Sequence, residues 1–155
     1  MAVKGAGSAL FIDTNTLVYA NVLEAPFHKN ALAAITAALE DERELWISRQ
    51  VIREYLATLT RPQVFGVVPK QVVLNQVSQF LEQFNVADDN RVVTEKLLNL
   101  MTHYEIGGKK IHDANIVATM LAYGIPAILT HNTNDFERFG DIIIVESIGW
   151  SGLFA

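Results

Sequence analysis

Four acidic residues, far apart in the sequence, occupy positions from which their carboxylates could act together on a substrate. They are Asp13, Glu54, Asp113 and Asp135. Carboxylates gathered in one place repel one another strongly unless a cation lies between them. Oxygen ligands, in a chain with no cysteine and no pair of histidines at helical spacing, favour Mg²⁺ or Mn²⁺ over Zn²⁺. Such a site can orient and deprotonate a water molecule for in-line attack on a phosphodiester.

Each acid also has an ordinary structural explanation when it is considered alone. Asp13 ends the apolar run 10–12, where it could serve only as the cap of a short helix. Asp113 precedes an apolar helical pattern as a cap would, and Glu54 borders the apolar face of another helix, where a solvated residue also fits. Asp135 lies in a polar loop after the apolar run 126–129. The metal-site interpretation therefore depends on whether the fold brings the four acids together.

Short apolar runs alternate with amphipathic segments along the chain. Strands are predicted at residues 10–12, 44–47, 84–86, 126–129 and 141–145. Helices are predicted at residues 17–20, 26–40, 51–59, 69–81, 93–101 and 113–121, with a loop or short helix at 133–139. Because the strands are apolar throughout, we expect a three-layer α/β/α sandwich with a mainly parallel sheet of about five strands. The carboxyl ends of parallel strands line a ligand crevice, so the acids would meet at one edge of this sheet.

The composition fits one compact domain spanning residues 1–155. The chain is 50% hydrophobic and 19% charged, enough for one sizeable core. The absence of cysteine excludes disulfides, thiol nucleophiles and cysteine zinc sites, and it fits a reducing compartment. No apolar run is long enough to cross a membrane, and residues 1–8 lack the apolar segment of a signal peptide, so we expect a cytoplasmic protein. A net charge of -5 argues against a protein that coats nucleic acid, but it is compatible with a metal-dependent nuclease.

Four short motifs, in this order and spacing, resemble those of a known family. They are Phe11-Ile12-Asp13-Thr14-Asn15, Glu54-Tyr55, His112-Asp113-Ala114-Asn115-Ile116 and Thr130-His131-Asn132-Thr133-Asn134-Asp135-Phe136. The set resembles the PIN-domain ribonucleases, and specifically the VapC-type toxins of bacterial toxin–antitoxin modules. The resemblance extends from Leu10 to about Val145. It implies a Mg²⁺-dependent endoribonuclease with a sheet sandwiched between helices, usually a homodimer, held inactive by a small antitoxin protein whose tail covers the active site.

The resemblance also implies a role for each polar residue of the motifs. Asp13 and Asp113 match the principal Mg²⁺-binding acids, Glu54 matches the acid on the helix after the second strand, and Asp135 matches the fourth and most variable acid. Thr14 and Asn15 match residues that support the first acid, while Thr130 matches a hydroxyl residue that often holds a metal-bound water. The sequence leaves open whether Asn132 or Asp135 faces the metal, and whether one ion or two bind.

RNA binding requires cationic contacts to phosphate in addition to a metal. The basic residues that flank the acids and are the preferred candidates are Arg53, Lys109, Lys110 and His112. The alternative for each of them is an ordinary solvated surface charge.

Two other classes of function compete with the nuclease. A metal-dependent phosphatase could use a similar sheet, although a dehalogenase-type site requires a second Asp where Asn15 stands. A non-catalytic module that binds a partner is also compatible with an acidic edge, although a receiver-like domain would have a lysine after its last strands and residues 146–155 contain none.

Overall fold

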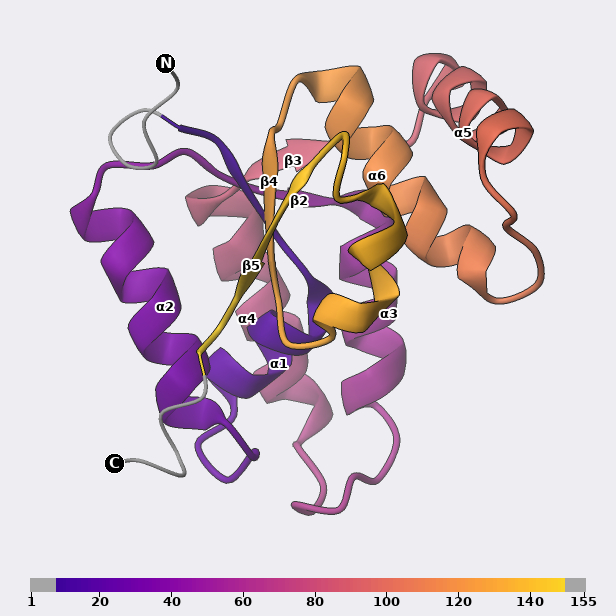
Figure 1. The fold of residues 1–155 in the computed structure, drawn as a ribbon. Helices are drawn as coiled ribbons and strands as arrows, with labels where there is room; N and C mark the ends of the chain where they lie inside the picture. Colours follow the sequence, from indigo (N-terminus) through magenta and orange to yellow (C-terminus); the bar gives the residue numbers. More distant parts are fainter. Residues whose placement is uncertain (1–7, 150–155) are drawn as a thin grey trace.

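The computed structural model describes residues 8–149, which form a sheet covered by helices on both sides (Figure 1). Within this range the sheet has five strands, all parallel, in the order β3-β2-β1-β4-β5. The strands are β1 (Leu10–Ile12), β2 (Leu45–Ser48), β3 (Asn85–Ala87), β4 (Ala127–Thr130) and β5 (Ile144–Ser147). The predicted parallel sheet of about five strands is confirmed.

The helices between these strands fall into two packed groups. They are α1 (Thr14–Asn21), α2 (His28–Glu40), α3 (Arg49–Leu59), α4 (Lys70–Gln83), α5 (Arg91–His103) and α6 (Lys110–Tyr123), followed by the short 3₁₀ helices η1 (Thr133–Asp135) and η2 (Glu137–Phe139). Helix α1 packs against α2 and α3, α3 packs against α4, and α5 packs against α6. In Figure 1, α5 and α6 lie together on one side of the sheet, and α1, α2 and α4 lie on the other.

The strand order explains this division into two layers. The chain steps from β1 to β2 to β3 in one direction, and then returns past β1 to place β4 on its other side. Since crossovers between parallel strands are right-handed, reversing the direction moves the connecting helices to the opposite face. The reversal occurs between β1 and β4, and this topological switch point is where open α/β sheets bind ligands.

Local sequence signals determine where the main helices begin and end. The side chain of Asp13 accepts a hydrogen bond from the amide of Thr14 at the start of α1, and the Ser48 hydroxyl accepts one from Val51 in α3. Helix α6 ends at Gly124, whose φ of 68° is left-handed, a conformation that glycine adopts without steric cost. These caps place the first residues of α1 and α3 directly after β1 and β2.

The core lies on both faces of the central strands. The strand residues Phe11, Ile12, Ile47 and Ile128 are completely buried. A buried ion pair connects the segment before β2 to β5. The guanidinium of Arg43 donates two hydrogen bonds to the Glu146 carboxylate, with Nη1–Oε1 and Nη2–Oε2 distances of 3.0 and 2.9 Å. Their side chains are 4% and 9% exposed, so the pair is largely removed from solvent.

Most boundaries differ from the sequence prediction by one to three residues, and two of these differences have a clear structural consequence. Helix α6 begins at Lys110, so Asp113 lies in its first turn, and the interpretation of Asp113 as a cap is wrong. The last strand begins at Ile144 and not at residue 141. The amides of Ile142 and Ile143 bond to the carbonyl of Phe139 in a turn, and pairing with the sheet starts only where the amide of Ile144 reaches the carbonyl of Pro126.

None of the helices described in residues 8–149 has the length and hydrophobicity needed to cross a bilayer.

Candidate active site

The register of β1 and β4 places the first acid beside a buried threonine. Ile12 pairs with Leu129, so the next residues, Asp13 and Thr130, leave the two strands side by side. The Thr130 hydroxyl donates to Asp13 Oδ2 at 2.7 Å, and this threonine is fully buried. Asn15 Nδ2 donates to the same oxygen at 3.1 Å, while the amide of Thr14 donates to Oδ1 at 2.8 Å. Asp13 is therefore held rigidly at the switch point.

The loop after β4 is fixed to α1 by the same polar residues. The amide of His131 donates to Asn15 Oδ1 at 3.0 Å, and the amide of Asn132 donates to the Thr130 hydroxyl at 3.0 Å. The ring of His131 packs on Phe27, with 4.3 Å between centroids. Since η1 follows immediately, these contacts determine where Asn132 and Asp135 lie relative to Asp13.

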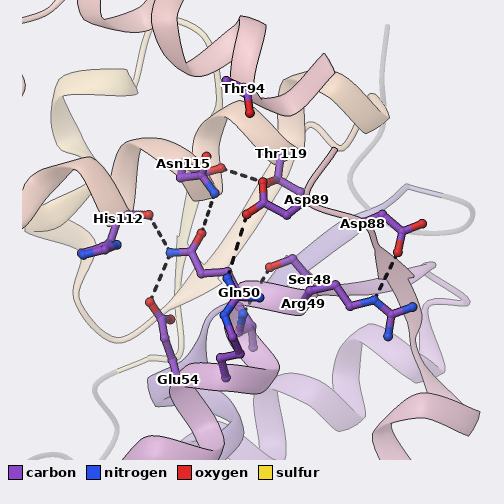
Figure 2. A network of polar contacts seen from close by, with 12 residues as sticks. Ser48, Arg49, Gln50, Glu54, Asp88, Asp89, Thr94, His112, Asn115 and Thr119 are labelled. Atoms are coloured by element: carbon purple, nitrogen blue, oxygen red, sulfur yellow. Dashed lines mark hydrogen bonds and ion pairs between the residues drawn. The ribbon is translucent and has the colours of Figure 1, made fainter. Parts of the chain in front are cut away.

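Glu54 reaches the same edge from α3. Its Oε1 accepts a hydrogen bond from the Thr14 hydroxyl at 2.7 Å. Its Oε2 accepts one from Gln50 Nε2 at 3.1 Å (Figure 2). Gln50 and Glu54 are one helical turn apart and share a face of α3. Two donors from two different helices thus orient the Glu54 carboxylate, which a merely solvated residue would not require.

The four acids line a single cavity of about 440 Å³. The polar residues of its wall are Asp13, Thr14, Asn15, Glu54, Thr58, Gln63, Asp113, Asn132 and Asp135. Its apolar wall consists of Val18, Tyr19, Pro26, Val64 and Phe65. Asn132 and Asp135 both line the cavity, and Thr130 lies behind Asp13. No sequence signal indicated the apolar wall, because it comes from loops and helix faces that adjoin the acids only in three dimensions.

Electrostatic repulsion links the four carboxylates: Glu54 acts on both Asp13 and Asp113, and Asp135 acts on Asp113. Burial raises the pKa of Asp13 to about 6, and repulsion from Glu54 and Asp113 adds to the increase. The hydrogen bonds from Thr130 and Thr14 act in the opposite direction and lower this pKa. Burial likewise raises the pKa of Asp113 to about 6, with further repulsion from Asp135 and Glu54. Nearby positive charge on His112 and Arg138 partly offsets this increase. A divalent cation among these carboxylates would reverse the repulsion.

No three acidic or histidine side chains within residues 8–149 are close enough together to form a ready metal-binding group. The donor set nevertheless fits a hard cation, because the acidic groups on the wall are carboxylates and most of the remaining polar groups are amides and hydroxyls. Mg²⁺ usually keeps several of its waters and takes only one or two protein carboxylates together with substrate phosphate. Carboxylates spread around an open cavity, rather than converged on a point, are compatible with that coordination.

The predicted phosphate contacts lie outside the cavity wall. Lys109, Lys110 and His112 are exposed around the start of α6, next to Asp113 in sequence. Arg53 is also exposed, and its guanidinium lies 3.9 Å from the carboxylate of Asp89. Arg138, which the sequence reasoning did not single out, acts electrostatically on Asp113 and donates to the carbonyl of Glu105 at 2.6 Å. Arg138 lies in η2, two residues after the last motif ends at Phe136, and no sequence pattern there indicates its effect on Asp113.

Comparison with known proteins agrees with this fold. Ribonuclease VapC48 from Mycobacterium tuberculosis is 28% identical over 140 residues, which cover 85% of this chain and 92% of the relative. A toxin–antitoxin complex from Klebsiella pneumoniae matches with a TM-score of 0.64 at 22% identity, over 92% of this chain and 98% of the other. The Mycobacterium tuberculosis toxin VapC20, described as cleaving the sarcin–ricin loop, matches with a TM-score of 0.61 at 15% identity, over 77% and 86% of the two chains. The family model of the PIN domain matches residues 10–142, and the chain belongs to the PIN domain family.

Proposed function

We propose that this protein is a Mg²⁺-dependent endoribonuclease and the toxin of a VapBC-type toxin–antitoxin module. The observation that carries the proposal is the cavity at the switch point: four carboxylates from separate parts of the chain line it, and burial together with repulsion from neighbouring acids raises the pKa of Asp13 and of Asp113. An arrangement that destabilises its own charges is typical of a functional site and not of a stabilising ion network. The name of the relative VapC48 supports RNA as the substrate.

In this proposal Asp13 and Asp113 hold the cation, and Glu54 and Asp135 complete the site with Asn132 beside them. When bound, the cation supplies Lewis-acid stabilisation of phosphate charge and increases the acidity of the attacking water. Mn²⁺ would serve as a substitute, since it shares the preference for oxygen ligands. Thr130 and Asn15 keep the Asp13 carboxylate in one orientation, which limits the reorganisation needed when the cation and substrate bind.

The acidic cavity requires positive charge nearby to accept a polyanion. Lys109, Lys110 and His112, at the start of α6, are suitably placed to contact phosphates on either side of the scissile bond, and Arg138 adds a fourth positive group near Asp113. Arg53 is a weaker candidate, because Asp89 already offsets its charge.

The partners proposed are RNA, a small cognate antitoxin and a second copy of this chain. The Klebsiella pneumoniae neighbour was solved as a toxin–antitoxin complex, which supports the antitoxin. The homodimer is an expectation from the family resemblance, and light scattering of the purified protein tests it.

The test is cleavage of a mixed set of structured RNAs by the purified protein, in Mg²⁺ or in EDTA, with Asp113→Asn as the matched variant. Cleavage that requires Mg²⁺ and is lost in the variant supports the proposal, and the fragment ends then identify the target. Cleavage that persists in Asp113→Asn, or hydrolysis of a small phosphomonoester with no action on RNA, contradicts it. The second result would favour the phosphatase alternative.

A further inference from the structure

A buried glutamine, Gln50, lies close to the acidic cavity but does not line it. Gln50 is in the first turn of α3 and is only 5% exposed. Its amide makes three hydrogen bonds, all to elements of the site (Figure 2). Nε2 donates to Glu54 Oε2 at 3.1 Å and to the carbonyl of His112 at 2.8 Å, while Oε1 accepts from Asn115 Nδ2 at 2.8 Å. Because Gln50 is absent from the cavity wall, it can affect the substrate only through these neighbours.

The partners of Gln50 leave only one orientation for its amide. A backbone carbonyl can only accept a hydrogen bond, so the NH₂ group must face His112. The same NH₂ group then supplies its second hydrogen to Glu54, and the amide oxygen must face Asn115. Both hydrogens of the Gln50 Nε2 group and its Oε1 atom are therefore hydrogen-bonded, so this neutral side chain is fully satisfied beside the carboxylates of the site.

Two of these bonds, to the carbonyl of His112 and from Asn115, join α3 to α6, the helices that carry the second and third acids. The third, to Glu54, lies within α3. Glu54 is on α3, and Asp113 is on α6 between the two residues that Gln50 contacts, His112 and Asn115. The other oxygen of Glu54 is bound by the hydroxyl of Thr14, the residue whose amide Asp13 caps. If Gln50 were removed, the hydrogen bond from Thr14 would be the remaining one to the Glu54 carboxylate among residues 8–149, and the link from Glu54 through Gln50 to the start of α6 would be lost.

We propose that Gln50 is a positioning residue that sets the Glu54 carboxylate relative to Asp113 for cation-dependent catalysis. The inference rests on the proposed metal-dependent nuclease, and it assigns to Gln50 no contact with the substrate or the cation. Partners that orient the ligands of a metal typically change metal affinity or activity by 10–100-fold when they are removed.

The test uses Gln50→Met, which removes all three hydrogen bonds at nearly constant volume. Gln71→Leu, on the exposed surface of α4, is the control for an altered glutamine away from the site. The first readout is Mn²⁺ binding to the EDTA-treated protein without RNA, measured by calorimetry. The second is the single-turnover rate of RNA cleavage at saturating Mg²⁺. We expect Gln50→Met to lose about 10–100-fold in one or both readouts, with Gln71→Leu unchanged.

A double-mutant cycle with Glu54→Ala separates positioning from a general effect on the fold. If Gln50 acts through Glu54, then Gln50→Met adds little to the loss already caused by Glu54→Ala. Equal losses in both backgrounds overturn the proposal, and so do wild-type cation binding and cleavage in Gln50→Met. Should Gln50→Met fail to fold, Gln50→Asn carries the same cycle, because it keeps a polar amide but is too short to bridge α3 and α6.

The outcome also distinguishes this proposal from the proposed function. If the wild type binds Mn²⁺ but cleaves no RNA, the nuclease assignment fails, while the calorimetric cycle still decides the role of Gln50. If the wild type binds no divalent cation, both proposals are overturned.

Discussion

Replacing Asp113 with Asn should stabilise the protein in the absence of a divalent cation while removing its function. The raised pKa of Asp113 means that its ionised form is less favourable in the folded state than in the unfolded chain. An increase from 3.8 to about 6 corresponds to an upper limit of about 3 kcal/mol at 1.36 kcal/mol per unit. Within residues 8–149 no hydrogen bond holds this carboxylate, so the amide breaks none, and the attraction to His112 and Arg138 that it loses is already included in the raised pKa.

Two effects reduce that upper limit. Asp113 is only partly buried, so solvent screens its repulsion from Asp135 and Glu54. Asp113 also lies in the first turn of α6, where the helix dipole favours a negative charge by about 0.3–1 kcal/mol. We therefore expect Asp113→Asn to raise the free energy of unfolding by about 1 kcal/mol at pH 7.5 in EDTA.

The pH dependence has a definite sign. Since the folded-state pKa of Asp113 lies above the unfolded value of 3.8, the folded protein binds the proton more tightly, and stability is lost as the pH rises through about 6. The advantage of Asp113→Asn should therefore vanish below the unfolded pKa of 3.8, be only partial at pH 4.5 and be complete above about pH 7. Saturating Mg²⁺ should reverse the order, because a ligand that binds only the folded state stabilises the wild type by mass action.

Urea denaturation followed by circular dichroism, at pH 4.5 and pH 7.5, measures these differences. The reasoning is refuted if Asp113→Asn is no more stable than the wild type at pH 7.5 in EDTA. It is also refuted if the gain is the same at both pH values, since a change independent of pH cannot come from the ionisation of Asp113.

Three further predictions concern the residues around the site and the sheet. Thr130→Val should lower the free energy of unfolding by about 1–3 kcal/mol in urea, because it leaves Asp13 and the amide of Asn132 without their buried hydroxyl partner; an unchanged midpoint would contradict this. Arg43→Met should lower the free energy of unfolding by about 1–3 kcal/mol, measured the same way, because the largely buried hydrogen bonds of the guanidinium to Glu146 and to the carbonyl of Ser8 are lost; a urea midpoint equal to that of the wild type would contradict this. Replacing Lys109 and Lys110 by Gln should make the plot of log RNA affinity against log salt concentration less steep, by about 0.7 in slope for each phosphate that is no longer neutralised. Filter-binding titrations in EDTA measure this slope, and an unaltered slope would mean that neither lysine contacts RNA phosphate.

The sequence could predict those parts of the site that depend on a single strand and the turn after it. The apolar run before Asp13, and the polar residues after it, indicated both the strand and the acid at its end, and in the structure Asp13 both caps α1 and lines the cavity. The two functions are compatible because one carboxylate oxygen accepts the Thr14 amide while the other faces Thr130 and Asn15. The capping role of Asp13 therefore does not exclude the metal-binding role proposed for it.

The parts that could not be predicted depend on contacts between elements. The importance of Gln50 comes from the approach of α3 to α6, and nothing in its neighbours along the chain indicates that approach. The start of α6 was misplaced because Lys109, its N-cap residue, provides no capping side chain, and the usual signal of Ser, Thr, Asp or Asn is absent. The start of β5 was misplaced because Ile142 and Ile143 belong to a turn, although they are as apolar as a strand.

The central claim is that acids from β1, α3, α6 and η1 form one divalent-cation site at the switch point of the sheet. The most direct measurement is the anomalous difference density of crystals grown with Mn²⁺, compared between the wild type and Asp113→Asn. We predict a Mn²⁺ peak in the cavity, coordinated by Asp13 and Asp113, that disappears or weakens strongly in the variant. A wild-type crystal at saturating Mn²⁺ with no peak in this cavity, or with its peak elsewhere on the protein, would contradict the claim.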